Sequence, residues 1–478
     1  LAQRQAALCH SLSADFCASA ALSKGRKILS DTNHTPRRAI GLITAISIVV
    51  GCMIGTGVFL KPAIMSAEVG SVAMVLAAWL FAGLLSLAGA LTYGELTSRM
   101  PAAGGEYAIL HATYGEFPAY LYGWMRFTIG APGSAASYAV GAATFLHVAY
   151  PYEALGLKVW QVAVIFVAFF TFINTLTILV SASVQVLLTA IKVASLVAIV
   201  VALIFFTPAH NGVNPPVAWP GMVSFSAAVM AALWAYDGWN NLPMLGAELN
   251  NPRRNLPLAL TLGMIVVIII YIAVNSAFFR VLPFQDVVAM VPGRVAAVQP
   301  VATAAMAKSI SDASVKVIAT LLVISALGAM NGSILASARV SYAMARDGIF
   351  FQPLARLSHR HAIPVIATLA EGAIAALLAA SGTFDQLTDS VVFASWLFYG
   401  LTAATIFKVR HMPLAAGETA VFKMPFYPVL PVVFLVCSAA FLVYSVIAIP
   451  WLTATGLGLI ALGVPLFFVF RRQQKRPL

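Results

Sequence analysis

Charged side chains are scarce in this sequence, because Asp, Glu, Lys and Arg together make up only 9% of its 478 residues. Soluble globular domains carry about 25%, so a soluble protein is excluded. The sequence also lacks a Gly-x-x-x-x-Gly-Lys phosphate loop and a His-Glu-x-x-His zinc motif, and its four cysteines have neither metal-ligand nor disulfide-framework spacing. No nucleophile and base set is recognisable. We therefore expect a protein that is not an enzyme and that holds no cofactor and no metal.

Apolar residues, in contrast, make up 61% of the chain and gather in long continuous runs. A membrane-spanning helix needs about 20 such residues. Runs of this length follow one another from residue 39 onward, at 40–66, 71–93, 118–146, 160–180, 184–206, 222–246, 257–280, 315–345, 363–381, 386–408, 427–447 and 450–470. The pattern predicts an all-α polytopic membrane protein with twelve transmembrane helices.

The basic residues indicate how the chain is oriented. The formal net charge is +12, but Lys and Arg are scattered singly between the apolar runs, which is typical of membrane topology rather than of a nucleic-acid-binding patch. With both ends inside, 19 Lys and Arg lie inside, six lie outside and three fall within spans. This asymmetry predicts cytoplasmic termini. We expect a cytoplasmic tail over 1–38, a single twelve-helix membrane domain over 39–470 and a basic cytoplasmic tail over 471–478.

Glycines interrupt the first predicted span. Three glycines within residues 51–57 each weaken a helix by roughly 1 kcal/mol relative to alanine. If the helix unwinds here, amides near Thr56 and Gly57 can bind a carboxylate, and carbonyls near Met53 and Ile54 can accept from an ammonium. A zwitterionic amino acid fits both ends. The alternative is a close-packing notch between straight helices.

The sixth predicted span is interrupted at a matching place, by Asp237 and Gly238 among the rings of Trp234, Tyr236 and Trp239. A carboxylate in mid-span costs about 3 kcal/mol and is usually kept for function, although a structural acid that pairs with a base or caps a broken helix is the alternative. The rings fit a pocket wall or lid, with an interfacial aromatic belt as the alternative. The two interrupted helices are five spans apart, and an odd number of spans inverts the second helix relative to the first. Paired interruptions of this kind are typical of transporters whose substrate site lies at the midplane of the bilayer.

Three basic residues lie within predicted spans. Lys192 lies too deep to reach the interface comfortably, so its ammonium is expected to hold unwound backbone as a bound sodium ion would, to carry a proton, or to form a structural ion pair. Arg126 and Arg339 have a more structural character. Arg339 and Glu248 lie at the cytoplasmic ends of the eighth and sixth spans, which allows an ion pair between them.

Several motifs resemble those of one family. They are Gly51-Cys52-Met53-Ile54-Gly55-Thr56-Gly57-Val58-Phe59, Tyr93-Gly94-Glu95-Leu96, Pro101-Ala102-Ala103-Gly104-Gly105-Glu106-Tyr107, Trp234-Ala235-Tyr236-Asp237-Gly238-Trp239-Asn240, Glu248-Leu249-Asn250-Asn251-Pro252-Arg253-Arg254-Asn255-Leu256-Pro257 and Asn331-Gly332-Ser333. From residue 39 to about 470 the chain is similar to the L-type amino acid transporters of the amino acid, polyamine and organocation superfamily. The resemblance implies the leucine-transporter fold, with inverted five-helix repeats over 39–206 and 221–408, discontinuous helices 1 and 6, and helices 11 and 12 over 426–470. It also implies sodium-independent transport of α-amino acids, mostly by obligatory exchange.

The resemblance also assigns site residues. Lys192 matches the fifth-helix lysine that replaces a sodium ion. The positions that match the substrate-binding residues of the family are Met53, Ile54, Gly55, Thr56, Gly57, Trp234, Ala235, Asp237, Gly238 and Asn240. By this resemblance Met53 and Ile54 offer carbonyls to the substrate amine, Thr56 and Gly57 offer amides to its carboxylate, and Trp234 acts as the gate.

Two departures from the family pattern refine the expectation. The loop 147–159 has no cysteine, so we expect no disulfide-linked heavy chain and a stand-alone bacterial member in the inner membrane. Thr56 stands where serine is commoner and Met53 where a β-branched residue is frequent, and the narrower pocket favours small or neutral substrates. An exchanger is predicted. The alternatives are a proton-coupled symporter with Lys192 as the proton carrier and, with less support, a non-transporting amino acid sensor. The sequence does not decide whether the substrates are neutral or cationic, nor does it give the oligomeric state.

Overall fold

The computed structural model describes residues 38–474 except 153–154, 213, 292–299, 309–311, 359–360, 382–383 and 413–421. This part of the chain is helical, with isolated β-bridges but no strand. The predicted tails fall mostly outside the described residues, which include only Arg38 of the first tail and residues 471–474 of the second. The all-helical part of the prediction is confirmed.

Seven helices among the described residues are long and apolar enough to cross a membrane, and a bent pair makes up to eight. The seven are α4 (Val72–Arg99), α12 (Pro252–Val281), α19 (Val429–Ala448) and the continuous helical runs Ile178–Phe206, Lys316–Arg346, Val391–Val409 and Thr453–Arg472. The bent pair is α2 (Leu42–Met53) with α3 (Gly57–Val69), and shorter apolar helices are α8 (Val159–Asn174), α10 (Met222–Ala235) and α16 (Val365–Ser381). The chain is a multi-pass membrane protein.

The third predicted span contains three consecutive elements. They are α6 (Glu116–Met125), the π-helical turn η1 (Arg126–Gly130) and α7 (Ala131–Ala149). A single π-helical turn inside an α-helix, called a π-bulge, widens the helix locally and is frequent at functional sites. This one begins at Arg126, whose side chain is buried.

The boundary between the fourth and fifth predicted spans differs from the prediction. α9 (Ile178–Val201) begins at Ile178 rather than near residue 184. The Thr177 side-chain oxygen accepts a hydrogen bond from the Val180 amide at 3.0 Å and caps this helix. Hydropathy could not place the boundary, because the residues on both sides of the cap are apolar.

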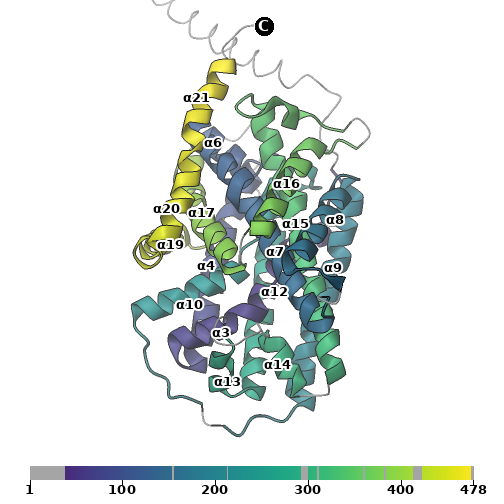
Figure 1. Cartoon of the computed structure of the whole chain (residues 1–478). Coiled ribbons are helices and arrows are strands. Elements are labelled where there is room, and N and C mark those ends of the chain that lie inside the picture. Colours follow the sequence, from purple (N-terminus) through teal and green to yellow (C-terminus); the bar gives the residue numbers. More distant parts are fainter. Residues whose placement is uncertain are drawn as a thin grey trace, which may run out of the picture.

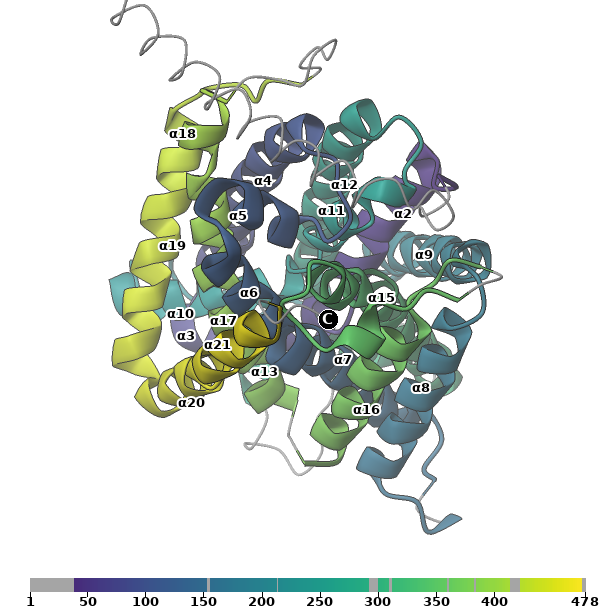
Figure 2. The same cartoon turned by 90° about the horizontal axis from the view of Figure 1, so that it is seen from above.

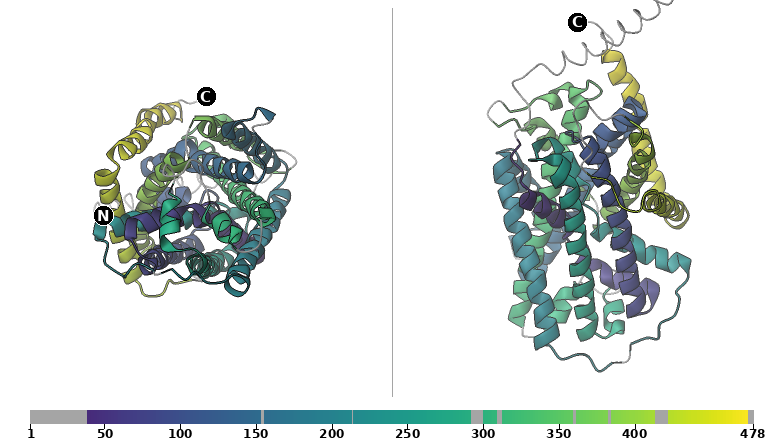
Figure 3. Two further views of the ribbon diagram at one scale, coloured as in Figure 1. Left: turned by 60° about the horizontal axis from the view of Figure 1, so that its bottom comes forward. Right: turned by 180° about the vertical axis from the view of Figure 1, so that it is seen from behind.

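The long helix α15 (Asp312–Arg346) packs against α7, α9 and α2. Seen from above, α15 and α7 lie centrally, between α8, α9 and α16 on one side and α19, α20 (Pro450–Ala461) and α21 (Gly463–Gln474) on the other (Figure 2). α12 packs along α4, and the two stand side by side in the view from behind (Figure 3). The C-terminal parts of α2 and α10 are buried within the bundle, whereas α10 begins at its edge (Figure 1).

Short helices connect the spans at both ends of the molecule. α5 (Glu106–Tyr114) lies between Gly105 and Gly115, whose φ angles of +50° and +89° are accessible to glycine at low cost. At the opposite end, α13 (Phe284–Ala289) and α14 (Val301–Ala307) pack against α3 (Figure 1). These helices are too short to produce a hydropathy run, and α5 matters most because it carries Glu106 into the interior.

Candidate functional site

The first span breaks between Met53 and Gly57. α2 and α3 meet at a bend of 41°. Ile54 has an extended backbone with ψ of 91°, and Thr56 is the N-cap of α3 without a side-chain capping bond. The interruption predicted within residues 51–57 is therefore present, at the C-terminal part of that segment. Straight helices with a glycine notch are not what the structure contains.

Hydrogen-bond donors are left unpaired at the start of α3. The backbone amides of Thr56, Gly57 and Val58 have no backbone acceptor among the described residues. The Thr56 hydroxyl is buried and, within the same part of the chain, has no hydrogen-bond partner. Free amides at a helix N-terminus, reinforced by the helix dipole, attract a carboxylate. The break thus offers the chemistry of an anion-binding site.

The sixth span breaks in a turn over residues 236–240, between α10 and α11 (Asn241–Met244). Gly238 lies in this turn with a φ of +115°, a conformation that L side chains rarely adopt. A Cβ added there would lie 2.9 Å from the carbonyl carbon of Cys52. Gly238 is therefore required both for the turn and for its close approach to the end of α2.

The two breaks lie against each other. A Cβ added to Gly57 would lie 2.7 Å from the Ala235 Cβ and 3.2 Å from the indole Cδ1 of Trp234. The Trp234 ring lies beside the Tyr138 ring of α7, with 5.5 Å between their centroids. Trp234 is buried. The start of α3 and the end of α10 are thus in contact, and the indole covers their junction.

One tyrosine joins both breaks. The Tyr271 hydroxyl on α12 lies 2.8 Å from the Met53 carbonyl oxygen and 2.9 Å from the Ala235 carbonyl oxygen. These two residues end α2 and α10, where carbonyls lack intrahelical partners. Tyr271 was not predicted from the sequence, although a hydroxyl within the apolar run 264–274 is a signal for it.

Lys192 on α9 contacts the first break. Its Nζ donates to the carbonyl oxygens of Gly51 at 2.8 Å, Ile54 at 2.7 Å and Ser325 at 2.9 Å. An ammonium has three N–H donors, so each of them has an acceptor. A Cβ added to Gly328 on α15 would lie 2.9 Å from Nζ, so a glycine there leaves room for the lysine. Lys192 ties the broken first span to α15 through backbone oxygens rather than through a carboxylate.

Three polar side chains hold the turn of the sixth span. They come from α17 (Phe384–Ala404), α5 and η1. The contacts join Tyr399 to the Asp237 carboxylate at 2.7 Å, Asn240 to the Glu106 carboxylate at 3.1 Å and Arg126 to the Asn241 amide oxygen at 3.1 Å. The turn is therefore fixed by three separate parts of the fold, and the Tyr399 hydroxyl donates to the Asp237 carboxylate.

Glu106 is a buried acid at this junction. Its carboxylate accepts a second hydrogen bond from the Tyr93 hydroxyl at 2.9 Å. Burial raises the pKa of the Glu106 carboxyl to about 6, while the hydrogen bonds from Asn240 and Tyr93 oppose the rise. Glu106 was not assigned a role from the sequence. An acid directly after two glycines, between two apolar runs, is the signal that points to it.

The ion pair that the sequence allows between Arg339 and Glu248 is present. The Arg339 Nε lies 3.0 Å from the Glu248 Oε1, and both side chains are buried. The pair joins the end of α15 to the short helix η4 (Gly246–Glu248) that follows α11. The pair lies near the start of α12, which follows η4 along the chain.

All ten predicted substrate positions lie at the two breaks and are buried. The carbonyls of Met53 and Ile54, predicted to face a substrate amine, already accept from Tyr271 and Lys192. Each carbonyl oxygen has a second lone pair, so substrate binding at these positions stays a prediction. Within the described residues, no group of three or more His, Cys, Asp and Glu side chains is placed to hold a metal ion.

Comparisons with known proteins point in the same direction as this geometry. The amino acid permease family model matches residues 40–470. The chain is 30% identical over 446 residues to the serine/threonine exchanger SteT of Bacillus subtilis, covering 92% of this chain and 98% of the relative. It is 31% identical over 382 residues to the mouse b(0,+)-type amino acid transporter 1, covering 78% and 76%, and 26% identical over 449 residues to the human cystine/glutamate transporter, covering 92% and 87%.

These relatives are transporters rather than enzymes. The match to the family model extends over both broken spans and over the helices that surround them. The chain belongs to the amino acid permease family, as an L-type amino acid transporter of the amino acid, polyamine and organocation superfamily.

Proposed function

We propose that the protein is a sodium-independent exchanger of α-amino acids that works by alternating access and prefers small or neutral side chains. The observation that carries this proposal is the contact between the two helix breaks. The amides of Thr56, Gly57 and Val58, which have no backbone acceptor among the described residues, suit a substrate carboxylate. The carbonyls that end α2 and α10 suit its ammonium. Each charge-assisted hydrogen bond of this kind contributes about 1.5–3 kcal/mol.

The proposed architecture has twelve spans in the leucine-transporter arrangement, with inverted repeats over 39–206 and 221–408 and both termini in the cytoplasm of the cell. Helices occupy most of the described residues in each of the twelve predicted apolar segments. The broken helices fall in the first and sixth of them, and the excess of Lys and Arg on one side supports the orientation. The loop 147–159, which offers no cysteine for a disulfide-linked heavy chain, supports a stand-alone protein, and we place that protein in the inner membrane.

Sodium independence is proposed from the surroundings of Lys192. Three backbone carbonyls converge on its Nζ at 2.7–2.9 Å, and the Ser325 hydroxyl also contacts the Ile54 carbonyl at 3.3 Å. A cluster of oxygens from unwound backbone is what a transporter of this architecture offers to a sodium ion. Here a covalently attached cation fills the position, so no sodium ion is needed to hold α2 against α15.

The alternative proposal, proton-coupled symport with Lys192 as the carrier, fits the same hydrogen bonds less well. A neutral amine has two N–H donors, so deprotonation would leave one of the three carbonyl oxygens without its partner in a buried place. An ammonium that keeps all three bonds favours a fixed charge. A non-transporting sensor has no separate support.

The test is uptake of labelled L-serine by purified protein in liposomes. The substrate is chosen from the activity named for the Bacillus subtilis relative. An exchanger takes up label into vesicles loaded with unlabelled serine and not into empty vesicles with an inward proton gradient. Uptake that needs only the proton gradient would contradict exchange and support symport. Competition by each of the twenty amino acids then defines the side chains that the protein accepts.

A further inference from the structure

Glu106 is a buried acid that takes no part in the proposed exchange. It begins α5, and none of its surface is exposed. Uncharged groups donate to its carboxyl: Asn240 Nδ2 to Oε1 at 3.1 Å, and the hydroxyls of Tyr93 and Thr402 to Oε2 at 2.9 and 3.4 Å. Among the described residues no ion pair includes this carboxyl. A buried carboxylate without a basic partner is costly to keep charged, so this environment favours the binding of a proton.

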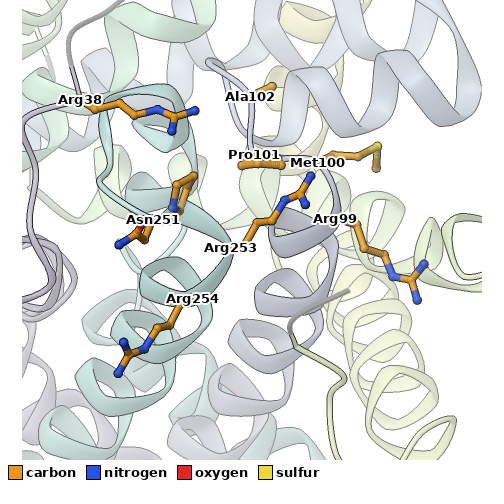
Figure 4. A pocket seen from close by; sticks show the side chains of 9 residues that line it. Arg38, Arg99, Met100, Pro101, Ala102, Asn251, Arg253 and Arg254 are labelled. Carbon is orange, nitrogen blue, oxygen red and sulfur yellow. The ribbon is translucent and has the colours of Figure 1, made fainter. Parts of the chain in front are cut away.

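The basic residues near Glu106 are directed elsewhere. The loop that leads to Glu106 lines a cavity of about 790 Å³ together with four arginines, and the lining residues are Arg38, Arg99, Met100, Pro101, Ala102, Asn251, Pro252, Arg253 and Arg254. Figure 4 shows the Arg99 side chain turned away from Pro101 and Ala102 of this loop. The basic residue that acts most strongly on the carboxyl is instead Arg126, whose guanidinium donates to the Asn241 amide oxygen at 3.1 Å.

The remaining ionisable groups around Glu106 come from several elements. They are Tyr93 of α4, Tyr122 of α6, Asp237 of the sixth-span turn, Tyr399 of α17 and, beside Tyr107 on α5 itself, Arg346 and Asp347. Of these, the Tyr107 hydroxyl donates to the Asp347 carboxylate at 2.8 Å. None of the groups in this set forms an ion pair with Glu106 among the described residues.

Close backbone contacts hold Glu106 against the sixth span. Gly105 has a φ of +50°, and a Cβ added to it would lie 2.8 Å from the Met244 backbone nitrogen. A β-bridge joins Ala103 to Leu245. The loop ahead of Glu106 therefore touches the chain that follows the sixth-span turn. Because of this contact, α11 cannot move away from α5 without uncovering the carboxyl.

The hydrogen bonds around Glu106 accommodate a proton. The Tyr93 hydroxyl, which donates to Oε2, also lies 3.5 Å from the Tyr399 carbonyl oxygen. When a proton from water binds Oε2, the new O–H donates to the Tyr93 oxygen, and Tyr93 turns its own hydrogen to the Tyr399 carbonyl. Asn240 keeps Oε1 as its acceptor. No other covalent bond forms or breaks, and no residue has to be displaced.

We propose that Glu106 is a proton-binding site, which holds a proton while the two helix breaks touch and releases it to water when they part. The inference rests on the proposed alternating access, but not on the identity of the amino acid. The site is separate from Lys192, whose ammonium keeps its three backbone acceptors. The proton is thus a second ligand, which stabilises the state in which the breaks touch.

The size of this effect follows from linkage. Burial raises the pKa of the Glu106 carboxyl from 4.5 to about 6 in the state with touching breaks. A raised pKa stabilises that state fully below pH 4.5, and the stabilisation is lost as the pH rises through about 6. When the breaks part and water reaches the carboxyl, its pKa returns toward the ordinary value. The population of states with separated breaks should therefore be about eightfold smaller at pH 5 than at pH 7.5.

The experiment measures the rate at which dithiodipyridine labels Cys52 in the full chain, with the other three cysteines replaced by serine. Cys52 is buried beside Gly238 of the sixth-span turn. The test variant is Glu106→Gln, which stays neutral at every pH. The matched control is Glu116→Gln at the partly exposed start of α6. At pH 5 and at pH 7.5 the rate in the parent chain is divided by the rate in each variant, which cancels the pH dependence of the reagent.

We expect the ratio for Glu106→Gln to be about eightfold higher at pH 7.5 than at pH 5, and the ratio for Glu116→Gln to be the same at both. An equal ratio at both pH values for Glu106→Gln, or an equal change in the control, would overturn the proposal. Loss of serine exchange at every pH, with the expected labelling ratios, would contradict the proposed function and support the proton site.

Tyr93→Phe keeps the test decisive if Glu106→Gln folds poorly. The Tyr93 hydrogen bond lowers the pKa of Glu106, so its removal should move the midpoint of the labelling profile to higher pH than in the Glu116→Gln chain. A midpoint that stays in place would show that Glu106 does not bind the proton.

Discussion

The contact between the two helix breaks depends on the Tyr271 hydroxyl, and Tyr271→Phe removes that hydroxyl with little change in shape. One hydrogen is shared between the carbonyl oxygens of Met53 and Ala235, at 2.8 and 2.9 Å. A buried acceptor that loses its donor costs about 1–3 kcal/mol. The proposed alternating access requires the two breaks to part, so this cost falls on the state in which they touch. The population of states with separated breaks should rise by about 5-fold to 150-fold.

Cys52 reports that population directly. It is buried at the end of α2, beside Gly238 of the other break. In a background where the other three cysteines are replaced by serine, the rate of N-ethylmaleimide labelling of Cys52 should rise in Tyr271→Phe by the same factor. Excess L-serine should slow the labelling, because a bound substrate bridges the breaks.

Tyr236→Phe is the matched control. The Tyr236 ring packs against Tyr271 with 5.0 Å between centroids, and its buried hydroxyl has no hydrogen-bond partner among the described residues. Removal of this hydroxyl should leave the labelling rate within about twofold of the parent, since no buried acceptor loses a donor. An unchanged rate in Tyr271→Phe, or an equal rise in both variants, would refute the role of the shared hydrogen bond.

Three further outcomes are expected. Lys192→Ala should abolish serine exchange while the protein stays folded, whereas Lys316→Ala, at an exposed position of α15, should keep it; exchange at the parental rate in Lys192→Ala would contradict the proposed role. Trp234→Ala should slow exchange at least tenfold and raise the apparent KM with little change in Tm, so unaltered kinetics would argue against a gate. Arg339→Gln and Glu248→Gln should each cost about 3–5 kcal/mol of unfolding free energy, because each leaves a buried charge unpaired, and additive losses in the double variant would show that the two side chains do not interact.

The long apolar runs predicted an all-helical membrane protein, and the described residues confirm it, because a bilayer demands such runs. The count of twelve spans stays a prediction. The start of α9 was misplaced, since apolar residues flank the capping Thr177 on both sides. The break in the first span was predictable from its glycines, although its position at residues 54–56 depends on contacts with Lys192 and Tyr271. These contacts join residues that are far apart along the chain, so the sequence around the break could not predict them.

Within the candidate site, single unusual residues were predictable and their partners were not. Asp237 and Lys192 stood out as charges in apolar runs. Tyr399 and Ser325, which bind them, come from helices more than a hundred residues away, as the separations of 162 and 133 show. Only the packing of α17 and α15 against the breaks brings these residues to the site. The pair Arg339–Glu248 was found because both residues lie at helix ends on one side.

The most direct test of sodium independence is serine exchange by the unmodified protein in liposomes, measured in sodium chloride and in choline chloride. Because the Lys192 ammonium already occupies the oxygen cluster of Gly51, Ile54 and Ser325, the rate and the apparent KM should be the same in both media. Exchange that requires sodium, or that saturates with sodium concentration, would contradict the assignment of Lys192 as the fixed cation at the first break.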